Sequence, residues 1–334
     1  MQGLMKFNVA AILMLVLLAA YPRSASAELT SHFSKPVLSY LRFDGQGQLW
    51  RARQQADQIW LDVSHDMGAS FAKPQAVQKV AELSQLVGLQ LAKDGQLNLI
   101  GLDDKGMLTS QMMPQLLANP ADTSAGLPIP LGRLDLACAS QQLAWAVKPD
   151  ANLVAMWPQR VEAEAEAYDY MLAEMPFRAA QRATYARWSL SHCQQGAAAL
   201  AAGGEGQDWW GYHMAWFDGG NDANGQSAGL YYARMDGVAW ASTPAKKFAG
   251  SKNLAGHPAL LSVGENVYLV WRESEAKTHK ILGKYSDDGG RNWSEPKLLA
   301  ETNGKADYPQ LLNRDKQVYL AWQTAQEGLR LLAW

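Results

Sequence analysis

Several short apolar runs in this sequence are preceded by residues whose side chains could do chemistry. His257 stands before Ala259-Leu260-Leu261, and Tyr308 holds the same place before Gln310-Leu311-Leu312. Comparable positions are held by Lys35, Cys138, His192 and Cys193. Imidazole, thiol and phenol groups can transfer protons or act as nucleophiles. These positions are therefore the first place to look for a functional site.

The cysteines and histidines among them allow two interpretations. Cys138, His192, Cys193 and His257 offer sulfur and nitrogen ligands of the kind that bind copper or zinc. The four residues contain no C-x-x-C or H-x-x-x-H spacing, so we expect no metal site and no cofactor. A Cys138–Cys193 disulfide is the favoured use, and it would close a loop of about 55 residues. Two separate buried thiols are the alternative.

Two turn motifs indicate the elements that position these side chains. Both read S-x-D-x-G-x-x-[FW], and both are followed by a proline three residues after the aromatic residue. An Asp carboxylate can accept backbone N–H groups inside a tight turn, and Gly accepts the positive φ that other residues resist. The aromatic residue would then pin the turn to the sheet. The motif residues are Ser64, Asp66, Gly68 and Phe71 in the first copy, and Ser286, Asp288, Gly290 and Trp293 in the second.

A longer repeat gives the period. The unit that begins at His257 continues to an apolar strand ending at Trp271, and the unit that begins at Tyr308 continues to Trp322. Corresponding residues of the two units are therefore 51 residues apart. Such a period suits propeller blades of four strands. We expect an all-β, six-bladed β-propeller, with five or seven blades as the alternatives. The blades should begin near Pro36, Gln85, Leu134, Ser189, Ala255 and Asp307.

Two segments are less regular. The last blade should have three strands at the end of the chain, and residues 29–33 are expected to supply its outer strand and close the ring. Residues 161–175 mix Glu, Ala, Leu and Met, which favours a helix. Their Glu-Ala alternation leaves a strand as the alternative. The loop from Asp218 to Asn224 carries oxygen ligands without the spacing of a calcium loop, so a solvated hairpin is favoured.

The turn motifs resemble the Asp-box, or BNR repeat, of sialidases and related propellers. That resemblance implies three arginines that clamp a substrate carboxylate, a Tyr nucleophile assisted by a Glu, and an Asp that handles the proton. On this resemblance the catalytic candidates are Tyr308, Glu273 and Asp57, with Tyr308 as the nucleophile. The arginine candidates are Arg53, Arg234 and Arg272.

The match is incomplete. Ser34-Lys35-Pro36 stands where the family keeps its first arginine, and the loss of one guanidinium from a buried clamp leaves a charged ligand group under-paired. We therefore predict a glycan-binding or protein-binding propeller with a degenerate glycosidase site, its ligand lying across the axial face. Trp209, Trp210 and His257 are further binding candidates. Three arginines around one point would instead favour an active exo-α-sialidase, and a metal-linked accessory protein is the third hypothesis.

Each candidate also has a purely structural interpretation. Tyr308 would only mark a strand start, Arg53 with Asp57 would be a solvated hairpin pair, and Arg272 with Glu273 a surface pair. Asp66 and Asp288 are expected to be turn residues without a chemical role.

The N-terminus reads as a signal peptide. Lys6 precedes an apolar run, and Ala25-Ser26-Ala27 is a small-residue cleavage site, so the mature chain would be one domain of residues 28–334. A retained anchor is the alternative. We expect a secreted or periplasmic protein without a membrane attachment. Removal of the signal peptide takes the net charge from −2 to −4, and the sequence has no Lys/Arg cluster, so we expect no nucleic-acid partner.

Overall fold

The computed structural model divides into two units, residues 1–35 and 36–334, and every described residue belongs to the second. The structure describes residues 39–55, 58–77, 85–91, 96–113, 129–134, 143–161, 167–176, 179–189, 198–204, 206–220, 227–250 and 256–334. The predictions for the signal peptide, residues 29–36, Asp57, Cys138, His192, Cys193 and the loop 221–226 lie outside the described residues.

The described chain forms six antiparallel sheets, each made of strands that follow one another in the sequence. Blade 1 contains β1 (Ser39–Phe43), β2 (Leu49–Gln55), β3 (Gln58–Ser64) and β4 (Gln75–Ala76). Blade 2 contains β5 (Gln85–Leu91), β6 (Leu97–Leu102), β7 (Met107–Met113) and β8 (Ile129–Arg133). Blade 3 contains β9 (Ala144–Val147), β10 (Leu153–Arg160), β11 (Ala167–Met175), β12 (Gln181–Arg182) and β13 (Trp188–Ser189).

The second half repeats this plan. Blade 4 contains β14 (Ala198–Gly203), β15 (Gly211–Asp218), β16 (Gly229–Asp236) and β17 (Lys246–Gly250), and a short 3-10 helix, η3 (Gly206–Asp208), precedes β15. Blade 5 contains β18 (Gly256–Val263), β19 (Asn266–Glu275), β20 (Thr278–Ser286) and β21 (Lys297–Asn303). Blade 6 contains β22 (Gln310–Arg314), β23 (Gln317–Thr324) and β24 (Gly328–Ala333).

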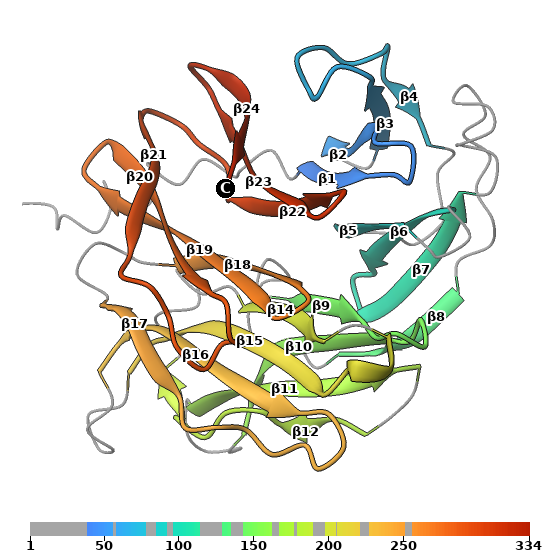
Figure 1. The fold of residues 1–334 in the computed structure, drawn as a ribbon. Helices are drawn as coiled ribbons and strands as arrows, with labels where there is room; N and C mark the ends of the chain where they lie inside the picture. Colours follow the sequence, from blue (N-terminus) through green and yellow to red (C-terminus); the bar gives the residue numbers. More distant parts are fainter. Residues whose placement is uncertain are drawn as a thin grey trace, which may run out of the picture. The chain divides into compact units, whose positions relative to one another are not determined.

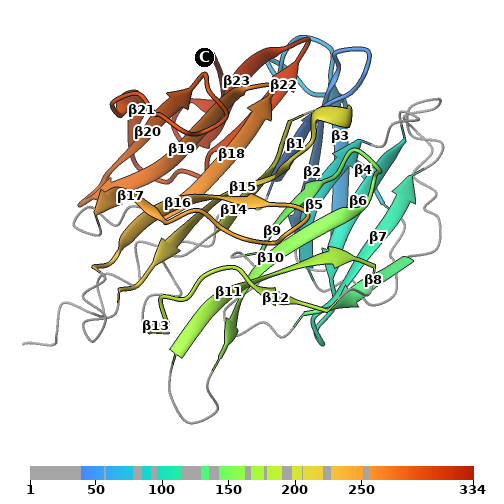
Figure 2. The ribbon, with the colours of Figure 1, turned by 60° about the horizontal axis from the view of Figure 1, so that its bottom comes forward.

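The first strands of the six sheets meet around a common centre (Figure 1). Neighbouring first strands contact each other from β9 through β14, β18, β22 and β1 to β5. The ring continues between β5 and β9, where the Trp145 indole donates to the Val87 carbonyl oxygen at 3.2 Å. Figure 2 shows the same arrangement from another side, with β5, β9 and β14 central and β8, β12 and β17 peripheral. The predicted six-bladed β-propeller is confirmed.

The amide of Gln310 joins the first and last blades at the centre. Its Oε1 accepts from the Leu41 N–H at 3.0 Å, and its Nε2 donates to the Ser39 carbonyl oxygen at 2.7 Å. The side chain of a β22 residue thus bonds the backbone of β1 as a paired strand would. We call this contact the seam.

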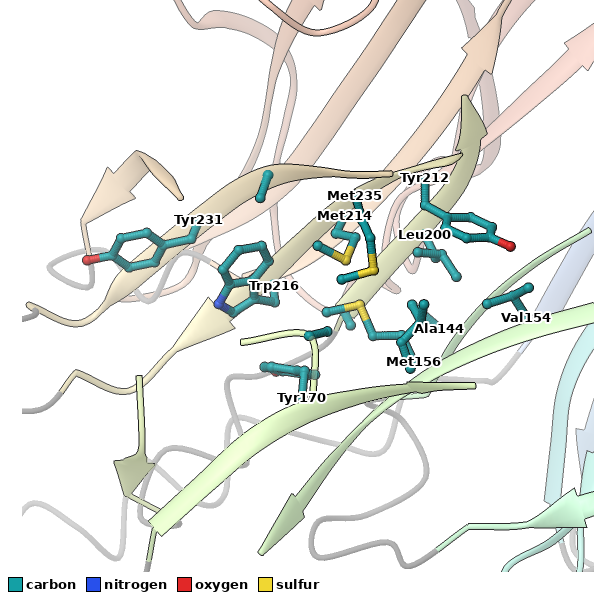
Figure 3. Packing of buried hydrophobic residues seen from close by; sticks show 14 of the residues in the cluster. Ala144, Val154, Met156, Tyr170, Leu200, Tyr212, Met214, Trp216, Tyr231 and Met235 are labelled. Atoms are coloured by element: carbon teal, nitrogen blue, oxygen red, sulfur yellow. The ribbon is translucent and has the colours of Figure 1, made fainter. Parts of the chain in front are cut away.

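The core lies between the blades. Between blades 3 and 4 the thioethers of Met156, Met214 and Met235 meet beside Tyr170 and Trp216 (Figure 3). These side chains come from the facing sides of two sheets, because alternate residues of a strand point to opposite faces. A middle strand is therefore buried on both faces, as every described residue of β15 is.

The helix expected over residues 161–175 is wrong for residues 167–175, which form strand β11, the alternative that the sequence left open. Leu153 pairs with Met175 and Arg160 pairs with Tyr168, so β11 is antiparallel to β10. Eight of the nine residues of β11 are buried. Burial on both faces of a blade outweighs the local preference of Glu, Ala, Leu and Met for helix.

Each blade has two ends. The first strands begin at one, which we call the entry end. The turns after the first and third strands lie at the other, which we call the turn end, and this end carries the motif turns of residues 64–71 and 286–293. In the part of the chain that is described, no helix is long and apolar enough to span a membrane.

Candidate functional site

Three sequence-predicted residues meet at the entry end of blades 5 and 6. His257 lies in β18, at a register shift where β18 pairs with β19, and its φ of 51° is in the left-handed region. A bulge of this kind can re-aim a side chain, and non-glycine residues in left-handed backbone concentrate at functional sites. The His257 ring stacks on the Tyr308 ring, with centroids 3.5 Å apart and planes at 15°.

Arg272 completes this group, which we call the entry cluster. It lies in β19 opposite Gly256, and its Cζ is 4.8 Å from the centroid of the Tyr308 ring, a cation–π distance. Its Nη1 donates to the Ala306 carbonyl oxygen at 3.1 Å. The residue is buried, yet no acid pairs with it among the described residues.

The surroundings fix the charge of each group. Burial, and then the nearby Arg272, lowers the pKa of His257 well below its usual value, so this imidazole is neutral at pH 7. Burial also lowers the pKa of Arg272, against Tyr308 and Asp307, which raise it. Burial raises the pKa of Tyr308, so its phenol is protonated at pH 7. The cluster presents one cation, one neutral imidazole whose Nδ1 has no partner in the described chain, and one hydroxyl.

Two residues that the sequence interpretation missed adjoin the entry cluster. The pKa of Tyr40 in β1 is raised by burial and by Tyr308, which places the two phenols near each other. Asp307 influences both Arg272 and Tyr308, and its backbone bonds Gln323 and Trp322 of β23. Asp307 could have been found as the neighbour of Tyr308, whereas Tyr40 carries no sequence signal beyond lying in the first strand.

The remaining entry-end candidates have other contacts. The Arg53 Nη2 lies 2.7 Å from the Asp62 carboxylate, which is fully buried and also holds Arg51. Glu273 follows Arg272 in β19 and therefore points to the other face of blade 5. There its carboxylate accepts from the Trp271 indole at 3.0 Å.

Arg234, Trp209 and Trp210 lie at the turn end instead. Arg234 is opposite His213 in the register of β15 and β16, two residues from the Gly211–Asp236 pair that ends these strands. Its Cζ lies 4.3 Å from the centroid of the Trp210 ring. Trp209 and Trp210 directly precede β15. The structure therefore does not bring Arg234 together with Arg272, as an exo-sialidase clamp would require.

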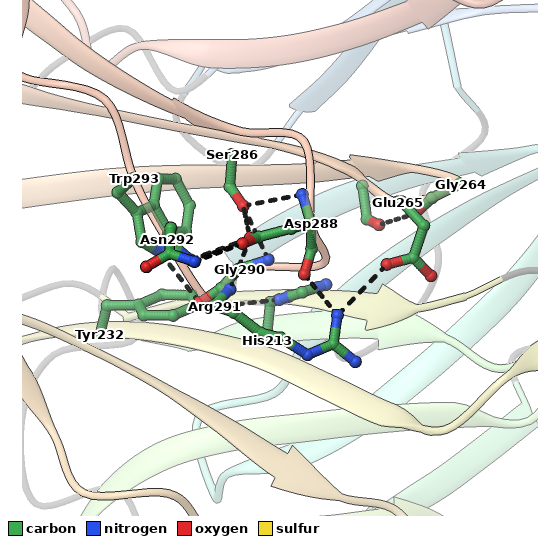
Figure 4. Close-up of polar contacts among 11 residues, drawn as sticks. His213, Tyr232, Gly264, Glu265, Ser286, Asp288, Gly290, Arg291, Asn292 and Trp293 are labelled. Atoms are coloured by element: carbon green, nitrogen blue, oxygen red, sulfur yellow. Dashed lines mark hydrogen bonds and ion pairs between the residues drawn. The ribbon is translucent and has the colours of Figure 1, made fainter.

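The two motif turns are held by their own polar groups. The Asp288 carboxylate accepts from the Ser286 hydroxyl and from the N–H groups of Arg291 and Asn292, at 2.8 to 2.9 Å (Figure 4). These bonds hold the pKa of Asp288 well below its usual range. Gly290 has a φ of 79°. The indole of Trp293 donates back to the Gly290 carbonyl oxygen at 3.1 Å.

The first turn has the same construction. Asp66 accepts from the Ser64 hydroxyl and the Ser70 N–H, each at 2.8 Å, and its hydrogen bonds, above all those with Ser70, lower its pKa to about 2. Gly68 has a φ of 82°. Phe71 stacks with Arg51, whose Cζ is 3.6 Å from the ring centroid.

A metal centre finds no support in the described chain. No group of three or more His, Cys, Asp or Glu side chains is placed to hold an ion among the described residues. His257, the one described member of the predicted set, stacks on Tyr308.

A neutral imidazole and a protonated phenol are suited to hydrogen bonding rather than to proton transfer at pH 7. A guanidinium and a hydroxyl beside the stacked His257 and Tyr308 rings could contact a polar ligand with an acceptor group and an apolar face.

Comparisons with known proteins show the fold. No protein-family model and no curated protein matches this chain. Among solved structures, the SapL1 lectin in complex with α-methyl fucoside matches at 11% identity and a TM-score of 0.55, over 90% of this chain and 93% of that one. An α-L-arabinanase of Penicillium chrysogenum, complexed with arabinobiose, matches at 12% identity and a TM-score of 0.54, over 89% and 92%. A mutant α-L-arabinofuranosidase of Fusarium graminearum, in complex with an iminosugar inhibitor, matches at 10% and 0.54, over 86% and 88%.

Proposed function

We propose that this chain is an exported sialidase-like Asp-box propeller that binds a glycan at its entry end and does not hydrolyse it efficiently. The observation that carries the proposal is Arg272. Its guanidinium is buried, lies over the Tyr308 ring and forms no ion pair in the described chain, although the nearby Asp307 raises its pKa. A buried cation without an ion pair supports a ligand that supplies an acceptor.

The nature of the ligand follows from the rest of the cluster. The Tyr308 hydroxyl makes no hydrogen bond within the described chain and is not enclosed, so it can bond a ligand. The three matching structures described above hold a fucoside, arabinobiose and an iminosugar inhibitor. That likeness of fold supports a glycan over a protein ligand.

Weak or absent hydrolysis follows from the same geometry. Only Arg272 of the three candidate arginines lies in the cluster, because Arg53 pairs with Asp62 and Arg234 is at the turn end. Tyr308 stays protonated, and strand alternation places Glu273 on the other face of blade 5 from Arg272. A Tyr nucleophile needs a base that takes its proton.

A glycan array with sialylated, uronic-acid-containing and neutral glycans tests the binding. The wild type should retain at least one glycan, and Arg272→Gln should weaken that binding by about tenfold or more, since charged hydrogen bonds are lost. Arg291→Gln is the matched control, because Arg291 lies in the motif turn at the turn end, where its guanidinium faces Glu265 at 3.6 Å. Equal binding by wild type and Arg272→Gln would contradict the proposed site, and retention of no glycan would favour a protein ligand.

Hydrolysis is tested with a fluorogenic sialoside. The expected result is no turnover above that of the uncatalysed reaction. Turnover that Tyr308→Phe abolishes would overturn the binding-only proposal and identify the chain as a sialidase.

A further inference from the structure

The turn end of blade 4 carries a second cation without an acidic partner. Arg234 forms no ion pair and no side-chain hydrogen bond among the described residues. Its Nε is buried without a partner, while the two terminal nitrogens are not enclosed. The guanidinium is thus buried at its Nε and accessible at its two terminal nitrogens.

The platform under Arg234 is rigid. The guanidinium lies over Trp210, whose indole is edge-on to His213 with centroids 4.9 Å apart. A Cβ on Gly203 would overlap the Trp210 ring, so the indole rests directly on the backbone of β14. The backbone N–H of Trp210 donates to the Gly203 carbonyl oxygen at 3.0 Å.

His213 adds a buried polar atom beside this platform. The residue is fully buried, and its Nδ1 lies 2.7 Å from the Tyr232 hydroxyl. Its Nε2 has no hydrogen-bond partner among the described residues. Such a group indicates a site that is complete only when another molecule or a solvent molecule is present.

Two acids near this end, Asp236 and Asp288, are bonded within their own turns. The Asp236 carboxylate accepts from the N–H groups of Val238 and Ala239, at 2.9 and 2.6 Å. The Asp288 carboxylate is bonded inside its motif turn. Neither carboxylate forms an ion pair with Arg234, so the terminal nitrogens of the guanidinium are available to an outside acceptor.

We propose that Arg234, held over Trp210 beside His213, forms a second binding site that takes an oxyanion of a ligand, a carboxylate or a sulfate. A planar fork with two open nitrogens matches two oxygens of one such group. The site lies at the opposite end of the blades from the entry cluster, and it does not depend on the glycan proposal.

The Arg Nε–Hε signals in a nitrogen–proton NMR spectrum test the site directly. The signal missing from Arg234→Gln identifies Arg234, and Arg234→Lys provides a second assignment if the first variant does not fold. Sodium glucuronate and sodium sulfate are then titrated separately, with sodium chloride at matched ionic strength. The signal of Arg330, which pairs with Glu327 on blade 6, serves as the control.

The Arg234 signal should move saturably with glucuronate or sulfate and not with chloride. Arg234→Lys keeps the charge without the fork and has no guanidinium signal, so its titration is followed through the Trp210 indole N–H, which lies under residue 234 in the wild type. It should bind at least about tenfold more weakly. The salt with the lower dissociation constant identifies carboxylate or sulfate as the preferred group. Movement that is linear, equal in chloride, or no larger than that of Arg330 would overturn the proposal. Arg272→Gln should leave the titration unchanged, which separates this site from the entry cluster.

Discussion

Gly290 is the position where one methyl group should disturb the contact between two blades. Its φ is 79°, and a Cβ there would overlap the hydroxyl of the buried Tyr232 and lie 3.2 Å from the His213 Nδ1 (Figure 4). Gly290→Ala combines two costs. Left-handed backbone costs a residue with a Cβ roughly 1 kcal/mol. Overpacking of a close-packed contact adds about 1–3 kcal/mol. We expect the free energy of unfolding to fall by about 2–4 kcal/mol in total.

Two comparisons separate these costs. Gly264 also has a positive φ, of 60°, but nothing lies within 4 Å of a Cβ there. Gly264→Ala should therefore show only the backbone cost, about 1 kcal/mol. In Gly290→Ala/Tyr232→Phe the methyl no longer meets a hydroxyl, so the double variant should be more stable than the sum of its single changes predicts.

Urea unfolding followed by tryptophan fluorescence measures the wild type, Gly290→Ala, Gly264→Ala, Tyr232→Phe and the double variant. The reasoning about packing fails if Gly290→Ala and Gly264→Ala lose the same stability. It also fails if removal of the Tyr232 hydroxyl leaves the loss caused by Gly290→Ala unchanged, because the overlap would then lie elsewhere.

Three further predictions concern groups away from that contact. Asp62→Asn should cost about 3 kcal/mol of unfolding free energy, since a buried carboxylate holds two arginines; an unchanged urea midpoint would contradict this. Burial raises the pKa of Asp218 to about 6, above its unfolded value of about 3.9, so its ionisation lowers stability as the pH rises from 4 to 6. Asp218→Asn should thus gain stability relative to wild type across that range, measured by urea midpoints at pH 4, 5, 6 and 7. Gly203→Ala should cost about 1–3 kcal/mol by displacing Trp210, with loss of the Trp210–His213 contact visible by NMR.

The repeats predicted the fold because they are local patterns tied to one structural unit. The step from His257 to Tyr308 corresponds to the step from β18 to β22, and both units continue into a strand that carries a buried Trp, Trp271 or Trp322. Local composition failed at residues 167–175, where both faces of β11 are covered by neighbouring blades. No window of sequence contains that information.

The grouping of the arginines failed for a different reason. Arg272 lies in the second strand of its blade, which runs toward the entry end, whereas Arg234 lies in the third, which runs away from it. Counting strands within each blade would have separated the two residues. Strand alternation would likewise have placed Glu273 and Arg272 on opposite faces of blade 5. Tyr40 could not have been paired with Tyr308, because the two meet only through closure of the ring.

The seam at Gln310 gives the entry cluster a mechanical meaning. The Gln310 amide of blade 6 makes two hydrogen bonds to the backbone of β1 in blade 1, and Tyr40 and Tyr308 belong to these two blades. A molecule that touches both phenols would link blades 1 and 6. Any ligand that binds only the closed ring stabilises the closed ring by mass action. Resistance to being pulled open and occupancy of the cluster would then rise together.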